Sequence, residues 1–324
     1  MSKGTVGTGW SLVWRHYKIL WWVFAINLIL GAMGTNMSRM EFGAILDRSL
    51  ASSRLANGFD MGTFIELLAK PEISMAALMR GSVVFSYLFF FFMLFITGGI
   101  LTAYREDRRL ATSEFFQASG GYFWRIVRLF LMSLIPLAVV GAITGFVFAI
   151  GSMIASEKTA FQVRLVGIGI GIVLVLLVRL WFDVAQVRAV AQNEYRMFRN
   201  LMRAFVISGK ALGTLLWMYL RISIVAWVIL GLGLWLWTRL PGNQVWATWL
   251  LLEVVMLAQI FARLWQRAAS VYWYGTYAEE HPAAVVEFTT QQPAEIAEVP
   301  VPQVPQPEIP PSNSVPGTEG SASS

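Results

Sequence analysis

Several ionisable residues lie inside long apolar stretches of the sequence, where a charge needs a partner or water, and two of them could meet with one amide. Arg221 belongs to the apolar stretch 215–237, and Glu253 and Gln259 belong to the next one, 245–265. At about 1.5 Å of rise per residue, neighbouring helices place Arg221 and Glu253 roughly 9 Å apart in depth, which a long arginine side chain can partly bridge. We predict a polar contact of the three residues inside a helical bundle, either as a structural pair between two helices or as part of a transport path.

The segment 182–205 combines positive charge with apolar surface. Near its start, Arg179 and Asp183 stand four residues apart and can pair on one helix face, which favours an anchor at a membrane interface. The segment is predicted to form one basic amphipathic helix, which attracts anionic lipids at about 1 kcal/mol per basic residue near a membrane surface. The alternative is a solvated connector packed on its neighbours. The candidate lipid contacts are Arg196, Arg199 and Arg203.

Motifs of enzyme chemistry are missing from the sequence. It has no cysteine, and its two histidines, His16 and His281, lie near opposite ends of the chain. We find no HExxH, GxSxG or Walker loop and no carboxylate pair at hydrolase spacing. The glycine run 167–171 lies inside an apolar stretch rather than between a strand and a helix, so it is not a nucleotide-binding loop. The sequence therefore predicts no catalytic residue, no metal, no cofactor, and a protein that is not an enzyme.

The apolar stretches define the elements that must position these residues. The 324 residues are 56% hydrophobic and 14% charged, whereas soluble domains are about 45–50% apolar and about 25% charged. A helix needs about 20 apolar residues to cross a bilayer. We predict an all-α, polytopic transmembrane helical bundle with six spans, at about 19–35, 82–104, 129–153, 163–182, 215–237 and 245–265.

The distribution of Lys and Arg predicts the orientation of the six spans. If the sides alternate with each span, the segments on the side of the N-terminus carry fourteen Lys and Arg, and those on the other side carry seven. The positive-inside rule then places both termini in the cytoplasm of a bacterium, with the spans in its inner membrane. We attribute the basic body to anionic lipid headgroups rather than to nucleic acid.

Two longer polar regions lie outside the spans, one between the first two spans and one after the last. The transmembrane domain, 1–278, includes an outside loop at 36–81, in which Ser38 to Glu41 and Thr63 to Glu66 fit the capping box and predict short amphipathic helices. These helices rest on the membrane surface or form a lid over a cavity. The acidic tail, 279–324, has seven glutamates, no Lys or Arg, and nine of the twelve prolines. It is predicted to be a disordered cytoplasmic tail that can recruit protein partners.

Glycines are spaced in ways that predict helix packing and a repeat. Gly167 and Gly171 form a GxxxG motif, as do Gly141 and Gly145, and small residues at this spacing let membrane helices approach closely. The three odd-numbered spans are approached through similar glycine-bounded stretches, 9–31, 120–141 and 209–231. This similarity favours three repeated helical hairpins. The alternative is that any membrane helix running from inside to outside shares a basic, aromatic entry and glycines.

The connectors 102–129 and 182–205 resemble those of a loose group of uncharacterised bacterial six-span integral membrane proteins, over about residues 9–275. They are more distantly similar to the membrane domain attached to some glycerophosphodiester phosphodiesterases. The sequence holds no phosphodiesterase catalytic domain, so the resemblance does not imply that activity. We expect a small transporter, permease subunit or lipid-handling protein. The alternative is a non-transport membrane scaffold that recruits partners through its tail and basic helix.

Overall fold

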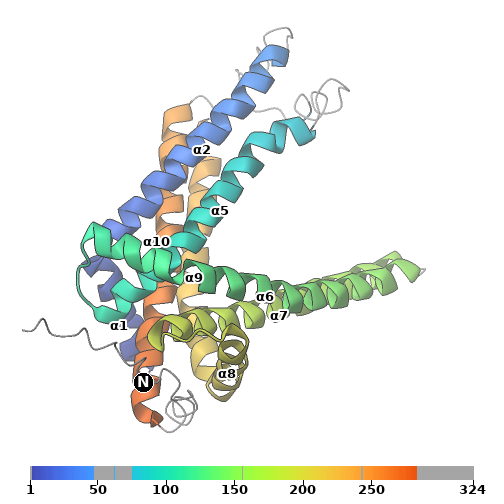
Figure 1. Ribbon diagram of the computed structural model, residues 1–324. Coiled ribbons are helices and arrows are strands. Elements are labelled where there is room, and N and C mark those ends of the chain that lie inside the picture. Colours follow the sequence, from blue (N-terminus) through green and yellow to red (C-terminus); the bar gives the residue numbers. More distant parts are fainter. Residues whose placement is uncertain (1, 47–61, 63–74, 155, 242–243, 283–324) are drawn as a thin grey trace, which may run out of the picture. The chain divides into compact units, whose positions relative to one another are not determined.

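The computed structural model describes residues 2–46, 62, 75–154, 156–241 and 244–282 (Figure 1). Over these residues the chain is all helical. The eight helices are α1 (Ser2–Arg15), α2 (Tyr17–Leu46), α5 (Met75–Glu106), α6 (Thr112–Met153), α7 (Glu157–Ala191), α8 (Met197–Lys210), α9 (Leu212–Arg239) and α10 (Val245–Glu280). The chain divides into two units, Met1–Glu280 and His281–Ser324. The predicted disorder of the tail concerns residues that lie almost entirely outside the described ranges, so it stays a prediction.

Six of the helices, α2, α5, α6, α7, α9 and α10, are long and apolar enough to cross a membrane, and each contains one of the six predicted spans. Their most apolar windows are only 11% to 33% buried within the protein. Trp227, Phe146 and Phe161 are each about two-thirds exposed. Apolar surface on this scale is stable only against a non-aqueous partner. The prediction of an all-α, multi-pass transmembrane fold is therefore confirmed.

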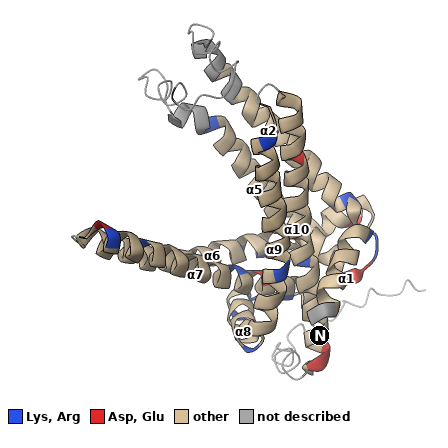
Figure 2. Cartoon of the chain, turned by 180° about the vertical axis from the view of Figure 1, so that it is seen from behind, with Lys and Arg blue, Asp and Glu red and all other residues tan. Residues whose placement is uncertain are grey.

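Charged residues are unevenly distributed: few lie along the long apolar helices, among them Arg263 and Arg267 near the middle of α10 (Figure 2). Many lie at what we call the connector end of the bundle, which comprises α1, the α5–α6 connector 107–111, the α7–α8 connector 192–196, and α8. A cluster of buried apolar side chains also draws on this end, with members such as Val13 of α1 and Leu201 and Ile207 of α8. The apolar core is therefore concentrated where the helices leave their most apolar segments.

The helices pack as hairpins, with α2 against α5, α6 against α7, and α9 against α10. Before the first span, the predicted approach begins in the separate helix α1, whereas the approach from Gly209 begins at the end of α8 and continues into α9. Before the third span, the approach is the continuous first part of α6. The hairpin arrangement agrees with the predicted one, but whether the three hairpins are repeats stays a prediction.

One of the two GxxxG motifs packs as expected. A methyl group added at Gly167 would stand 2.7 Å from Val147 Cγ1, and one added at Gly171 would stand 2.8 Å from Thr144 Oγ1. These contacts join α7 to α6 at a distance that only glycine allows. The other motif, 141–145, faces open space, since nothing described lies within 4 Å of a methyl group at either glycine.

Two predicted helix boundaries are wrong. The first predicted capping box in the outside loop begins at Ser38, but α2 runs without a break through that residue to Leu46. A capping box marks a helix start only where the preceding backbone is not helical, and here it is. The second capping box, 63–66, lies outside the described residues. The basic segment 182–205 is not one helix either, because α7 ends at Ala191 and α8 begins only at Met197.

Candidate functional site

A cavity of about 540 Å³ lies among α2, α5, α6, α7 and α10. Four of the side chains that line it are charged: Arg179 and Asp183 from α7, and Arg263 and Arg267 from α10. Three arginines against one aspartate give the lining a formal charge of +2. We call this the arginine cavity. Its lining helices are membrane-crossing, so the charges stand in a setting where uncompensated charge is costly.

Asp183 and Arg179 are already engaged by protein groups. The Tyr219 hydroxyl donates a hydrogen bond of 3.0 Å to Asp183 Oδ2, and Arg179 Nε lies 4.0 Å from the same oxygen. The sequence-predicted pair of Arg179 and Asp183 is therefore present, at the long end of ion-pair distance. Arg179 Nη2 also donates to Gln266 Oε1 at 2.9 Å, and Gln266 Nε2 donates to Ser223 Oγ at 3.0 Å.

Arg263 and Arg267 are not engaged in this way. Within the described residues, neither guanidinium donates a hydrogen bond, and Arg267 Nη1 is buried without a partner. A buried donor without an acceptor costs about 1–3 kcal/mol, and more when it is charged. The two arginines are four residues apart on α10, so they lie on one face of the helix, about one turn apart. The cavity therefore offers two adjacent cations without a protein acceptor.

The remaining lining is of two kinds. Amide groups come from Asn27, Gln186 and Gln259. Asn27 Nδ2 contacts the sulfur of Met256 at 3.3 Å, and Gln259 Nε2 donates to the carbonyl of Ala226 at 2.7 Å. Apart from Thr97, the other walls are apolar, and they include Phe89, Phe90, Met93, Phe130 and Met256. The cavity thus has a basic part and an apolar, aromatic part. Among the described residues, no three His, Asp or Glu side chains gather as metal ligands would.

The structure places the predicted intramembrane residues in three settings. Arg221 stacks over the ring of Trp217, 4.7 Å from its centroid. No ion pair joins it to Glu253, whose Oε2 is buried and has no partner among the described atoms. Only Gln259 reaches the arginine cavity. The predicted contact was based only on the depth of each residue along its helix. In the structure α9 turns Ile222 into the protein interior, and the preceding residue, Arg221, points about 100° away from Ile222 around the helix axis.

The three candidate lipid contacts also separate. Arg196 is exposed and precedes α8, and Arg199 is partly exposed on that helix. The third, Arg203, turns inward, where its Nη1 lies 3.3 Å from Glu194 Oε2. Burial lowers the pKa of the Arg203 guanidinium from its usual value, and the Glu194 carboxylate opposes that change. The outward face of α8 is apolar instead, and its exposed side chains are Phe198, Met202, Phe205 and Val206.

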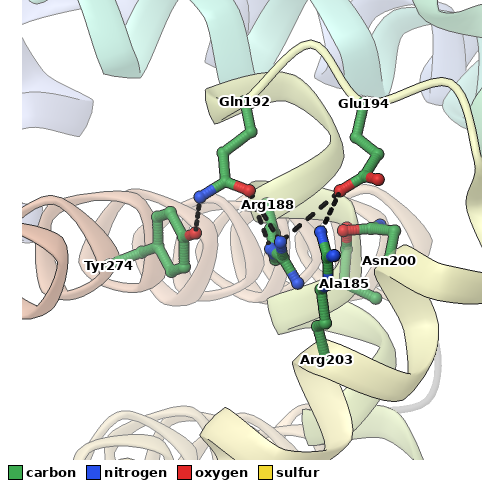
Figure 3. Close-up of polar contacts among 7 residues, drawn as sticks. All are labelled: Ala185, Arg188, Gln192, Glu194, Asn200, Arg203 and Tyr274. Atoms are coloured by element: carbon green, nitrogen blue, oxygen red, sulfur yellow. Dashed lines mark hydrogen bonds and ion pairs between the residues drawn. The ribbon is translucent and has the colours of Figure 1, made fainter. Parts of the chain in front are cut away.

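Arg203 belongs to a polar cluster that fixes the turn between α7 and α8 (Figure 3). Arg188, with 1% of its side chain exposed, donates to Gln192 Oε1 at 2.7 and 3.0 Å and to Glu194 Oε2 at 3.4 Å. Gln192 Nε2 in turn donates to the hydroxyl of Tyr274 on α10 at 2.9 Å. We call these five residues the clasp: Arg188, Gln192, Glu194, Arg203 and Tyr274.

The clasp explains why segment 182–205 does not form one helix. Gln192 reaches Arg188 across one helical turn, but Glu194, six residues after Arg188, meets it only because the backbone has left the helix. Between them, Asn193 adopts the left-handed region at φ 50°, which asparagine tolerates better than most residues. From α6, Arg125 donates to Asn193 Oδ1 at 2.6 Å and stacks over Tyr195 at 3.7 Å. The turn is therefore tied to α6, α7, α8 and α10.

Sequence reasoning missed Arg263 and Arg267 as site residues. The signal was present: two arginines at i, i+4 at the end of the last span, with Gln266 between them. Arg263 falls inside the predicted span 245–265 and Arg267 just beyond its end, so the sequence alone did not bring the two together. No family model, curated protein or solved structure matches this chain. The resemblance to membrane domains of glycerophosphodiester phosphodiesterases therefore stays a prediction.

Proposed function

We propose that this multi-pass membrane protein binds a ligand in the arginine cavity and handles it as a small transporter or a lipid-handling protein does. The observation that carries the proposal is the pair Arg263 and Arg267, which face a cavity among membrane-crossing helices without a protein acceptor. An intramembrane ionisable residue marks a functional site by default. Two such arginines one helical turn apart, with Asp183 as the one acid among the described residues that line the cavity, strengthen that expectation.

A purely structural role accounts less well for these arginines. A structural ion pair brings opposite charges together, as Arg179 and Asp183 do in the same cavity. Replacing a buried ion pair by apolar residues is often neutral or stabilising, so stability alone gives little reason to keep further charges. The volume, about 540 Å³, lies within the range of about 300–1,000 Å³ that is usual for ligand sites.

The proposed setting is a bacterial inner membrane, with the connector end in the cytoplasm. The support is the excess of Lys and Arg in the segments at this end, fourteen against seven on the other side. In this orientation Arg267 lies toward the cytoplasmic leaflet, whose surface is negatively charged. A ligand then reaches the arginine cavity from that leaflet or from the adjoining cytoplasm.

A cysteine-accessibility measurement tests the proposal, because the native chain has no cysteine. Gln186→Cys places a thiol on the cavity wall, and Ile170→Cys places one on the exposed apolar face of the same helix. Water-soluble thiol reagents need the thiolate, which forms only in contact with water. In phosphatidylcholine nanodiscs we expect Gln186→Cys to react and Ile170→Cys to stay unreactive. Equal, negligible labelling at both positions would contradict a ligand-accessible cavity.

Deleting residues 281–324 separates this function from the scaffold alternative. The scaffold role depends on the tail, which lies almost entirely outside the described residues. A cavity function depends on α2, α5, α6, α7 and α10. We expect the truncated chain to keep the labelling pattern of Gln186→Cys and its transport or lipid-handling activity. Loss of bound partners on truncation, with no transport or lipid-handling activity in either form of the chain, would instead support the scaffold.

A further inference from the structure

We infer that the ligand of the arginine cavity is an anionic amphiphile, with a phosphate group held between Arg263 and Arg267 and an apolar chain against the aromatic wall. The inference rests on the proposed function and names its substrate class. It combines three observations: the positive formal charge of the lining, the apolar and aromatic character of the rest of the lining, and the volume of the cavity.

The charge of the cavity selects an anion. Asp183 accepts from Tyr219 and lies beside Arg179, and Arg179 also donates to Gln266, so these groups are satisfied within the protein. The formal excess of +2 therefore rests on Arg263 and Arg267. Guanidinium groups bind the oxygens of phosphate and carboxylate through paired, charge-assisted hydrogen bonds. A lipid phosphodiester and a carboxylate each present one negative charge and two free oxygens to the two guanidinium groups, so both classes of anion fit the arginine pair.

The apolar wall selects a ligand with a hydrocarbon part. Phe89, Phe90 and Met93 of α5 line the cavity together with Phe130 of α6 and Met256 of α10. Phe90 and Phe130 pack edge to face, with ring centroids 4.9 Å apart. Inorganic phosphate would leave this wall facing water, at a cost of about 25 cal/mol for each Å² of apolar surface. An acyl chain would cover the wall while the phosphate meets the arginines.

The volume agrees with a ligand larger than an ion. One water molecule occupies about 30 Å³ in the liquid, so a cavity of about 540 Å³ far exceeds the space that inorganic phosphate needs. A phosphoglyceride headgroup with the first part of an acyl chain suits this space better. Because the walls come from membrane-crossing helices, a bilayer phospholipid is the nearest source of such a molecule.

The test uses Gln186→Cys protein and measures how well three probes protect its thiol from a water-soluble reagent. The probes are phosphatidylglycerol in nanodiscs, phosphatidylcholine in nanodiscs, and inorganic phosphate added to the phosphatidylcholine discs. We expect protection by phosphatidylglycerol alone. If inorganic phosphate protected the thiol as well as phosphatidylglycerol does, the ligand would be a free anion, and the inference of an amphiphile would be overturned. Labelling that none of the probes changes would overturn the inference while the proposed cavity stands. Absence of any labelling would overturn the proposed function itself.

Variants connect the protection to the two arginines. Arg267→Gln and Arg263→Gln each remove one charge, and Arg128→Gln removes an exposed arginine of α6 that does not line the cavity. A hydrogen bond to a charged group contributes enough to expect about a 10- to 100-fold weaker phosphatidylglycerol effect in each cavity variant. Arg128→Gln should keep the parent value. Equal protection in all three variants would overturn the assignment. Native mass spectrometry, which should detect co-purified anionic lipid in the parent and Arg128→Gln only, gives a second measurement that does not depend on labelling.

Discussion

Replacing Glu194 by Gln is expected to destabilise the turn between α7 and α8 strongly. Glu194 Oε2 lies 3.4 Å from Arg188 and 3.3 Å from Arg203, and the side chains of the two arginines are only 1% and 13% exposed. At an effective dielectric constant of about 20, each pair interacts with roughly 5 kcal/mol before desolvation is subtracted. Breaking a buried pair by removing one partner costs about 3–5 kcal/mol. Arg188 keeps Gln192 as an acceptor, so we expect a loss of about 3 kcal/mol in the free energy of unfolding.

The assay is reversible unfolding in mixed detergent micelles, followed by tryptophan fluorescence. Glu106→Gln is the matched control, because Glu106 pairs with Arg108 where both side chains are well exposed, at 39% and 54%. Exposed pairs contribute about 0–1 kcal/mol, so this control should change little. Adding Arg203→Gln to Glu194→Gln should recover part of the loss, since one uncompensated cation is then removed. A Glu194→Gln protein as stable as the Glu106→Gln control would refute the clasp as a buried ion-pair cluster.

Two further predictions follow from the packing and the surface charge. Gly171→Leu should lower the free energy of unfolding by about 1–3 kcal/mol, because the larger side chain overpacks against α6. Gly141→Leu is the control, because Gly141 lies at an open position, and it should unfold like the parent in the same micelle assay. Equal losses in the two variants would show that the α6–α7 contact is not as described. Replacing Arg196 and Arg199 together by Gln should weaken attraction to anionic vesicles by about 1 kcal/mol per residue without changing stability; unchanged binding in a vesicle co-flotation assay would show that the apolar face of α8 alone governs its contact with lipid.

Hydropathy predicted the spans well because crossing a bilayer is a one-dimensional requirement on the chain. An apolar run of sufficient length satisfies it whatever lies beside the run, so the segments 82–104 and 163–182 needed no tertiary information. The structure places them inside α5 and α7. The same reasoning could not give the ends of the helices. Both α5 and α7 extend well beyond the apolar runs, because a helix continues through polar residues wherever its neighbours still pack.

Side-chain partners needed information that the sequence lacks. The number of residues from each end of the span predicted that Arg221 lies near Glu253. In the structure the rotation of α9 about its axis places Arg221 over the ring of Trp217 instead. Arg203 looked like a solvent-facing lipid contact, yet it is drawn inward by Glu194 across a break that the helical pattern of 182–205 did not show. In each case the outcome depends on a contact between elements, and a helical period describes only one element at a time.

Cryo-electron microscopy of the protein in phosphatidylglycerol nanodiscs tests the central claim most directly. We predict density for a bound headgroup between the guanidinium groups of Arg263 and Arg267, continued by density for a chain along the wall that includes Phe90 and Met256. A map in which the cavity is closed by protein side chains, with Arg267 paired to Asp183, would contradict a ligand site at this position.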